Sequence, residues 1–150
     1  LPKGRGRGVS LLQDFGGTIL AQVAEVEVGD DFVVRVKRVT SVIDCGKIVN
    51  PDTVVAQIQG GVIFGLSAAL YGEITFNGGR VDQGNFDSYA VVRMNETPEI
   101  RVHLLESGEE PFGVGESGTA GIGPAVANAV HAATGKRPRK LPLSPDSLKA

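Results

Sequence analysis

Apolar and polar residues alternate along several stretches of the chain, a pattern typical of β-strands. The first stretch, residues 19–28, keeps a two-residue period with a phase slip near Ala24, which a β-bulge would cause. A second stretch extends from Val34 to Asp44, and the short turn before it predicts that the two strands pair as a hairpin. A further strand is predicted over residues 100–104. A short hairpin is predicted around Asn77-Gly78-Gly79, whose residues suit positive φ angles.

Two other stretches space their apolar residues three and four apart, which predicts amphipathic helices. The first helix is predicted over residues 51–71 with Asn50 as its N-cap, and the second over residues 123–134, ending at Gly135. The first helix also carries a face of small residues, made of Gly61, Gly65 and Ala68. Glycine inside a helix costs about 1 kcal/mol relative to alanine. We therefore expect this face to pack closely against another backbone or a ligand.

These elements predict an α+β fold in which antiparallel hairpins, or a mixed sheet, pack with two main helices. A length of 150 residues suits one core, so we expect a single domain over residues 1–150. Glycine and basic residues near the start predict an irregular segment over residues 1–10. The basic and proline-rich end predicts an irregular tail over residues 136–150.

Composition excludes some classes of partner. A net charge of -2 and a pI near 5.7 give no broad attraction to nucleic acid or to anionic lipid. No apolar run approaches the roughly 20 residues that span a bilayer, so membrane insertion is not expected. Cys45 is the one cysteine, and with His103 and His131 it forms no pattern of metal ligands. We interpret all three as structural residues and expect no metal ligand from the protein.

The motif Gly113-Val114-Gly115-Glu116 is the strongest candidate for chemistry. Its glycines allow positive φ and close approach to a bound molecule, so Glu116 could be presented as a catalytic base. The residue types alone also allow a solvated surface glutamate. The segment from Gly113 to Gly118 satisfies the G-x-G-x-x-G pattern as well, but Pro111 separates it from the preceding strand and Pro124 delays the helix, which disfavours a dinucleotide site.

Several short motifs occur together in an order that resembles the C-terminal part of the large subunit of molybdenum hydroxylases, the xanthine dehydrogenase and aldehyde oxidase family. They are Val42-Ile43-Asp44-Cys45-Gly46, Asn50-Pro51-Asp52, Gln57-Ile58-Gln59-Gly60-Gly61, Gly65-Leu66 and Gly113-Val114-Gly115-Glu116. Three more motifs resemble its isoquinoline 1-oxidoreductase β-subunit-like branch. These are Leu70-Tyr71-Gly72-Glu73, Arg93-Met94-Asn95-Glu96 and Pro124-Ala125-Val126-Ala127-Asn128-Ala129.

The resemblance implies roles for particular residues. The family's catalytic base falls on Glu116, and its pterin-contacting glutamine falls on Gln57. Gly113, Val114 and Gly115 would lie close to the cofactor. The family usually has proline after the glutamate, whereas this chain has Ser117-Gly118, so we expect a more mobile loop.

The resemblance also implies an activity: hydroxylation of an aldehyde or N-heterocyclic substrate with water as the oxygen source, by a molybdenum-pterin cofactor held in the full-length protein. The upstream part of the large subunit and an iron-sulfur small subunit would be partners, and this chain alone would be inactive. An alternative interpretation is a non-catalytic module of the same fold that serves subunit interaction or assembly.

Overall fold

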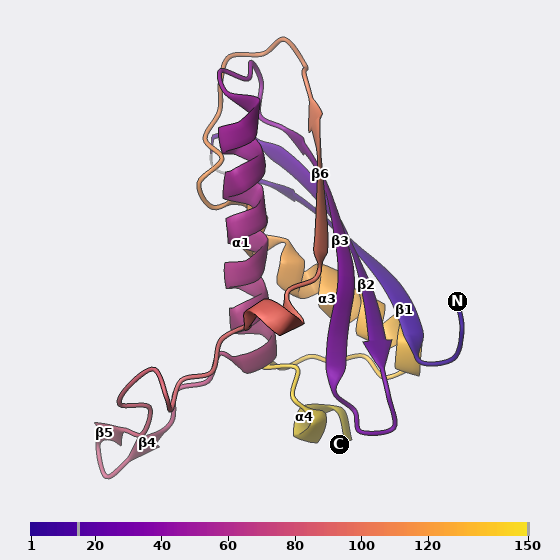
Figure 1. Cartoon of the computed structure of the whole chain (residues 1–150), viewed down its shortest axis with the longest axis vertical. Helices are drawn as coiled ribbons and strands as arrows, with labels where there is room; N and C mark the ends of the chain where they lie inside the picture. The colour runs from indigo at the N-terminus through magenta and orange to yellow at the C-terminus, as the bar shows by residue number, and fades with distance from the viewer. Residues whose placement is uncertain (15, 150) are drawn as a thin grey trace.

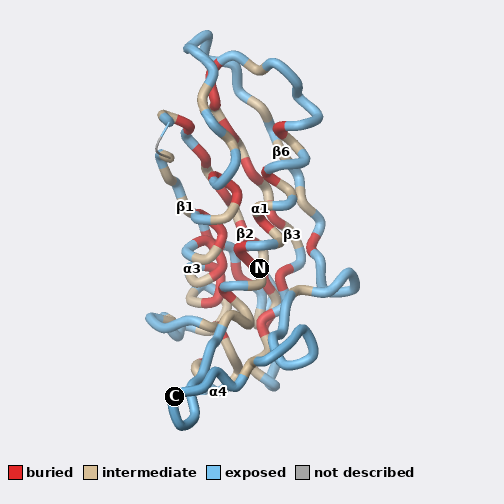
Figure 2. The backbone as a smooth tube through the Cα atoms, turned by 90° about the vertical axis from the view of Figure 1, so that its left-hand side faces the viewer, coloured by how far each residue is buried: buried red, intermediate tan, exposed pale blue. Residues whose placement is uncertain are grey.

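The computed structural model describes residues 1–14 and 16–149 and has an α+β fold, as predicted. A four-stranded sheet carries α1 and α3 on one face, and the buried residues lie between the two layers (Figures 1 and 2). The elements in chain order are β1 (Arg5–Gln13), β2 (Ile19–Val28), β3 (Val34–Asp44), α1 (Pro51–Tyr71), β4 (Phe76–Asn77), β5 (Arg80–Val81), the 3₁₀ turn η1 (Met94–Glu96), β6 (Glu99–Leu105), α2 (Ser117–Ala120), α3 (Ile122–Thr134) and α4 (Pro145–Lys149).

The sheet order is β1-β2-β3-β6. The first three strands are antiparallel neighbours, which confirms the predicted hairpin of β2 and β3. Strand β6 lies parallel to β3, so the chain must cross over between them, and α1 makes this crossover. The predicted short hairpin is also present as β4 and β5, which extend away from the sheet (Figure 1).

The bulge lies close to its predicted position but on the other strand. The register of β2 against β3 shifts between Glu25, which faces Arg38, and Val26, which faces Val36, so Lys37 is the extra residue. Strand β2 itself keeps one phase, because every second residue from Leu20 to Val28 is buried. Its opposite face is also rich in Ala and Val, which produced the apparent slip in the sequence pattern.

The helices match their predicted bounds closely. Asn50 caps α1, since its side-chain oxygen accepts a hydrogen bond from the Thr53 backbone N–H at 3.0 Å. Helix α3 begins at Ile122, one residue before the predicted start, and Gly135 ends it with a φ of 75°. Helix α1 corrects the expectation about membrane spans, because its length and mean hydropathy of 1.5 would suffice to cross a bilayer. One face of α1, which includes Val54, Ile58, Val62 and Leu66, is buried in the core of this domain. Core helices of folded domains can also be this long and apolar.

The prediction of an irregular segment over residues 1–10 is wrong from Arg5 onward, where β1 begins. The buried face of β1 at this end consists of Gly6 and Gly8, so it lacks the apolar residues that identify a strand. A Cβ atom on Gly8 would lie 2.1 Å from the Ala129 backbone N of α3. The helix can therefore pack directly on the strand backbone. The predicted irregular tail is also wrong over Pro145–Lys149, which form α4.

We expect Gly8→Ala to destabilise the protein, because the new methyl group would overlap the backbone of α3. Overpacking costs about 1–3 kcal/mol, and a backbone obstacle that cannot rotate away places this change at the upper end. Denaturant unfolding measures the loss. Gly84→Ala is the matched control, since a Cβ there meets nothing within 4 Å, and equal stability of the two variants would contradict this packing.

A second contact, at the other end of the core, ties α1 to η1. The Tyr71 hydroxyl donates a hydrogen bond to the Glu96 carboxylate. Burial is the largest cause, and this hydrogen bond the second, of a rise in the pKa of Tyr71 to about 12. Because the folded-state pKa lies above the ordinary value of 10.0, the neutral phenol stabilises the fold below pH 10, and this contribution is lost as the pH rises toward 12.

Absorbance titration of tyrosinate tests this directly, because the chain has only two tyrosines, Tyr71 and Tyr89. We expect one transition near pH 12 that Tyr71→Phe removes, while Tyr89→Phe leaves it in place. A spectrum in which Tyr71→Phe removes a transition near pH 10 instead would contradict the contact.

Candidate functional site

The backbones of α1 and α2 touch where both helices have glycine. A Cβ on Gly61 would lie 3.1 Å from the Cα of Gly118, and a Cβ on Gly118 would lie 2.7 Å from the carbonyl oxygen of Ile58. A Cβ on Gly65 would lie 2.5 Å from the carbonyl oxygen of Thr119. The predicted close packing of the small face is therefore confirmed for Gly61 and Gly65. Ala68 is exposed instead.

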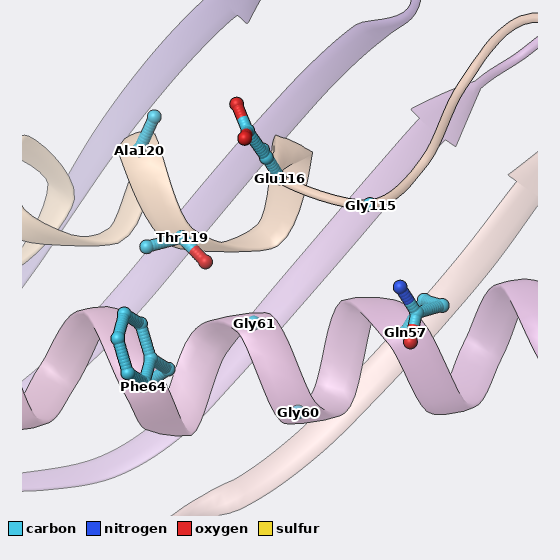
Figure 3. Close-up of a pocket in the computed structure, with 8 residues that line it drawn as sticks. All are labelled: Gln57, Gly60, Gly61, Phe64, Gly115, Glu116, Thr119 and Ala120. Atoms are coloured by element: carbon cyan, nitrogen blue, oxygen red, sulfur yellow. The ribbon is translucent and has the colours of Figure 1, made fainter.

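A cleft of about 470 Å³ opens beside this contact (Figure 3). Gln57, Gly60, Gly61 and Phe64 of α1 line one side, and Gly115, Glu116, Thr119 and Ala120 line the other. The predicted site residues Gln57, Gly115 and Glu116 thus come together from segments far apart in the sequence. The Glu116 side chain projects away from α1, whereas Gln57 belongs to α1 itself (Figure 3).

The other two predicted site residues do not line the cleft. The carbonyl oxygen of Gly113 accepts a hydrogen bond from the Thr18 hydroxyl at 2.7 Å, and Val114 is half-buried against the core. A Cβ on Gly113, Gly115 or Gly60 would meet nothing within 4 Å. Nothing in the described part of the chain crowds these glycines, so the space in front of them is open to another molecule or polypeptide.

Two of the polar side chains that line the cleft, those of Gln57 and Glu116, are exposed. Neither the Glu116 carboxylate nor the Gln57 amide has a hydrogen-bond or ion-pair partner among the described residues. An ionised carboxylate can only accept hydrogen bonds, whereas an amide both donates and accepts. The cleft therefore offers one group that can take up a proton and one that can orient a polar ligand.

Buried polar side chains hold the loop that carries Glu116, and sequence reasoning missed all of them. Besides Thr18, the Gln22 amide donates to the carbonyl oxygen of Gly118 at 3.2 Å, and the Ser10 hydroxyl donates to that of Gly121 at 2.7 Å. The Ser117 hydroxyl donates to Asp14 Oδ2 at 2.6 Å. Only Gln22 gave a signal in the sequence, as a polar residue at an inward-facing position of an apolar strand. Ser117, which predicted a mobile loop, in fact supplies one of its anchors.

One polar atom in this region has no hydrogen-bond partner among the described residues. Gln22 is fully buried, and its Oε1 atom is unpaired. A Cβ on Gly121 would lie 2.5 Å from this oxygen, and Gln22 does not line the cleft. The unpaired oxygen therefore belongs to the packing of Gly121 against the sheet and not to the candidate site.

The remaining candidates lie outside the cleft. Cys45 is 3% exposed, and burial, followed by the charge of Asp44, raises the pKa of its thiol, so its interpretation as a packing residue is confirmed. His103 is exposed on β6 and His131 is half-buried in α3. Within residues 1–14 and 16–149, no three or more His, Cys, Asp or Glu side chains are grouped so that they could hold a metal ion.

Comparison with known proteins assigns the chain to a family. Residues 13–98 match the family described as a molybdopterin cofactor-binding domain. The chain belongs to this family. The matched range of this molybdopterin cofactor-binding domain includes Gln57 and all of α1, whereas Glu116 lies beyond it.

Curated relatives point to the same group of enzymes. The beta subunit of isoquinoline 1-oxidoreductase from Brevundimonas diminuta is 39% identical over 127 residues, covering 84% of this chain and 16% of its own length. A nicotinate dehydrogenase subunit from Pseudomonas putida is 35% identical, covering 97% of this chain and 13% of its own length. The chain thus spans about a sixth or less of the length of these two relatives. The names of both relatives describe an oxidoreductase and a dehydrogenase, and with the match to a molybdopterin cofactor-binding domain they confirm the resemblance at family level.

Solved structures share the fold. Quinoline 2-oxidoreductase from Pseudomonas putida 86 superposes with a TM-score of 0.82 at 25% identity, over 88% of this chain and 18% of that one. A Cu,Mo-CO dehydrogenase superposes with a TM-score of 0.78 at 24% identity, over 87% of this chain and 18% of that one, which supports the fold alone.

The cleft suits part of a molybdenum-pterin group. Its volume of about 470 Å³ lies within the roughly 300–1,000 Å³ that is usual for ligand sites. A pterin is flat and rich in amide-like edges, which the Gln57 side chain can match with a donor and an acceptor. The open space at Gly60 and Gly115 leaves room for such a ring. Gln57 and Gly60 on one side of the cleft and Gly115 on the other would be the residues beside the group.

The contact between α1 and α2 leads to a pair of opposite expectations. Gly118→Ala should lower the free energy of unfolding by about 1–3 kcal/mol, because the methyl group would meet the carbonyl oxygen of Ile58. Gly60→Ala should raise it by up to about 1 kcal/mol, because the position is helical and open. Denaturant unfolding of both variants measures the effects. The contact is refuted if Gly118→Ala is as stable as Gly60→Ala.

Proposed function

We propose that this chain is the C-terminal part of the large subunit of a molybdenum hydroxylase that oxidises an aldehyde or an N-heterocyclic substrate, and that Glu116 is its catalytic base. The observation that carries the proposal is that Glu116 and Gln57 line one cleft although 59 positions separate them (116 − 57). The family match and the names of the relatives support the type of chemistry.

Glu116 has the features of a general base. It is exposed at the rim of the cleft, has no partner among the described residues, and follows a glycine with open space in front of it. An ionised carboxylate in this position can take a proton from a water-derived hydroxyl held in the cleft. Covering the cleft with further polypeptide would remove water from the carboxylate and raise its basicity.

Gln57 has a different role in the proposal. Its amide can hydrogen-bond the edge of the pterin and fix the orientation of the ring, and Gly60 and Gly115 leave room beside it. When bound, the molybdenum-pterin group supplies the two-electron oxidation that no side chain of this chain can provide. Gly113 and Val114 act indirectly, as part of the loop that leads to Glu116.

The site needs further polypeptide to be complete. The chain spans 13–16% of the length of these relatives, and the space in front of Gly60 and Gly115 at the cleft is open. Large apolar side chains are exposed on α1 and on the segment after it, among them Phe64, Phe86 and Met94, which are 71%, 89% and 95% exposed. Phe64 lines one hollow together with the exposed Tyr89 and Val91, and such grouped apolar exposure favours contact with another protein surface. We propose that the remaining large subunit and an iron-sulfur subunit are the partners, and that the isolated chain is inactive.

Glu116→Gln in the full-length enzyme tests the role of the base. The amide keeps the size of the side chain but cannot take up a proton, so kcat should fall by at least about 100-fold, in the usual range for loss of a general base. Molybdenum content should stay unchanged. Glu109→Gln, in the exposed stretch before the motif, is the matched control and should keep its activity.

A variant Glu116→Gln with normal kcat would remove Glu116 from the chemistry. Such a result, with intact assembly of the subunits, would favour the alternative in which this fold serves interaction or assembly alone.

A further inference from the structure

The turn between β1 and β2 packs directly against the start of the loop that carries Glu116. Backbone hydrogen bonds close this turn, from Asp14 N–H to the Thr18 carbonyl at 2.8 Å and from Gly17 N–H to the Asp14 carbonyl at 3.0 Å. Gly17 has a φ of +97°, and a Cβ there would lie 3.0 Å from the ring of Phe112. Asp14, Gly17 and Thr18 are therefore held together by backbone hydrogen bonds, and Gly17 lies close to the residue before Gly113.

Two side chains of this turn bind the loop on either side of Glu116. The Thr18 hydroxyl donates to the carbonyl oxygen of Gly113 at 2.7 Å, and Asp14 Oδ2 accepts from the Ser117 hydroxyl at 2.6 Å. Thr18 and Ser117 are both fully buried. One anchor lies three residues before Glu116, and the other lies at the residue directly after it.

Between the anchors, Val114 packs against the core, and the Glu116 carbonyl accepts a hydrogen bond from the Thr119 N–H at 2.9 Å. Gly115 and Glu116 are exposed, and the glycine lacks the Cβ that would limit its backbone angles. After Glu116 in the chain, the backbone of Gly118 contacts α1 and sets the distance between α2 and α1. This contact does not involve Glu116. The two side-chain anchors act at both ends of this segment, together with the Phe112 N–H bond to the Cys45 carbonyl before it and the Gln22 bond to the Gly118 carbonyl after it.

The hydrogen bonds of Thr18 and Asp14 are strong enough to hold the loop in this position. A hydroxyl that donates to a carboxylate at 2.6 Å is a charge-assisted hydrogen bond, about twice as strong as a neutral one. Thr18 is fully buried, so its hydroxyl is left without an acceptor when the loop moves away, which disfavours the displaced loop. A displacement of about 1 Å at a reacting group can cost roughly 100-fold in rate.

We propose that Asp14, Thr18 and Ser117 are positioning residues for Glu116: they hold the loop from the β1–β2 turn so that the carboxylate keeps its place at the rim of the cleft. They do not touch substrate or cofactor. This inference rests on the proposed function of Glu116. It adds that the precision of the base comes from a turn almost 100 residues away in the chain, since 98 positions separate residues 116 and 18 (116 − 18).

The test uses the full-length enzyme with its subunits. Thr18→Val removes the hydroxyl but keeps the shape, Thr18→Ser keeps the hydroxyl, and Ser117→Ala removes the other anchor. Thr134→Val is the matched control, because Thr134 also donates to a backbone carbonyl, that of Val130 at 2.8 Å, but lies at the end of α3. Measured are kcat, KM, molybdenum content, and hydrogen exchange of the amides from residue 112 to residue 118.

We expect Thr18→Val and Ser117→Ala to lower kcat about 10- to 100-fold, since they misplace the base. KM and molybdenum content should change less than about twofold, because the wall of the cleft formed by α1 is unaltered. Exchange of the amides from residue 112 to residue 118 should become faster in both variants. Thr18→Ser should recover most of the rate and of the protection, and Thr134→Val should match the wild type in both.

Normal kcat and normal exchange in Thr18→Val and Ser117→Ala would overturn the inference. Equal losses in Thr18→Val and Thr18→Ser would overturn it too, because the hydroxyl would then not be the cause. If Glu116→Gln is fully active, the proposed function fails by itself, and faster exchange in the two anchor variants would still show that the anchors hold the loop. If Glu116→Gln is inactive while the anchor variants are normal, only the positioning inference fails.

Discussion

The arrangement of the candidate site depends on the direct contact between the backbones of α1 and α2. Gly61 and Gly118 let the two helices approach until main chain meets main chain, and Gly65 extends the contact by one turn. Any side chain at these positions would push α2 outward and separate Gln57 from the loop of Glu116. The same device recurs where α3 packs on Gly6 and Gly8 of β1. Glycine thus serves mainly as a packing residue in this fold, and the cleft is a consequence of that packing.

Polar side chains add directional hydrogen bonds to the close packing that the glycines allow. Apolar packing has no direction, so it can bring a loop close to a sheet without fixing its register. Thr18, Gln22 and Ser10 point from the sheet at carbonyl oxygens of the segment from Gly113 to Gly121, and each bond is directional. Gln22 is fully buried in β2, Thr18 is fully buried in the turn before β2, and Ser10 is half-buried in β1, and together they define the path of that segment. The position of the exposed Glu116 therefore depends on these internal hydrogen bonds.

Local patterns predicted most of the elements, and long-range contacts explain what they missed. The cap at Asn50, the left-handed Gly135 and the alternation from Val34 to Asp44 each depend on nearby residues, so sequence alone was sufficient. Strand β1 was missed because its inward positions are glycines that only the partner helix explains. Glu116 was a candidate from its glycine motif, Gln57 was identified through the resemblance, and their shared cleft required the fold. The anchors were missed because the residues that bind are roughly 100 positions apart, as in Asp14 and Ser117.

The position of molybdenum relative to this chain tests the proposed role of the cleft most directly. Anomalous diffraction at the molybdenum edge, from crystals of the full-length enzyme with its cofactor, locates the metal independently of any interpretation of the pocket. We predict that the metal lies beside the carboxylate of Glu116, with the pterin against Gln57 in the cleft between α1 and α2. A metal peak on another face of the domain, distant from both residues, would contradict this role.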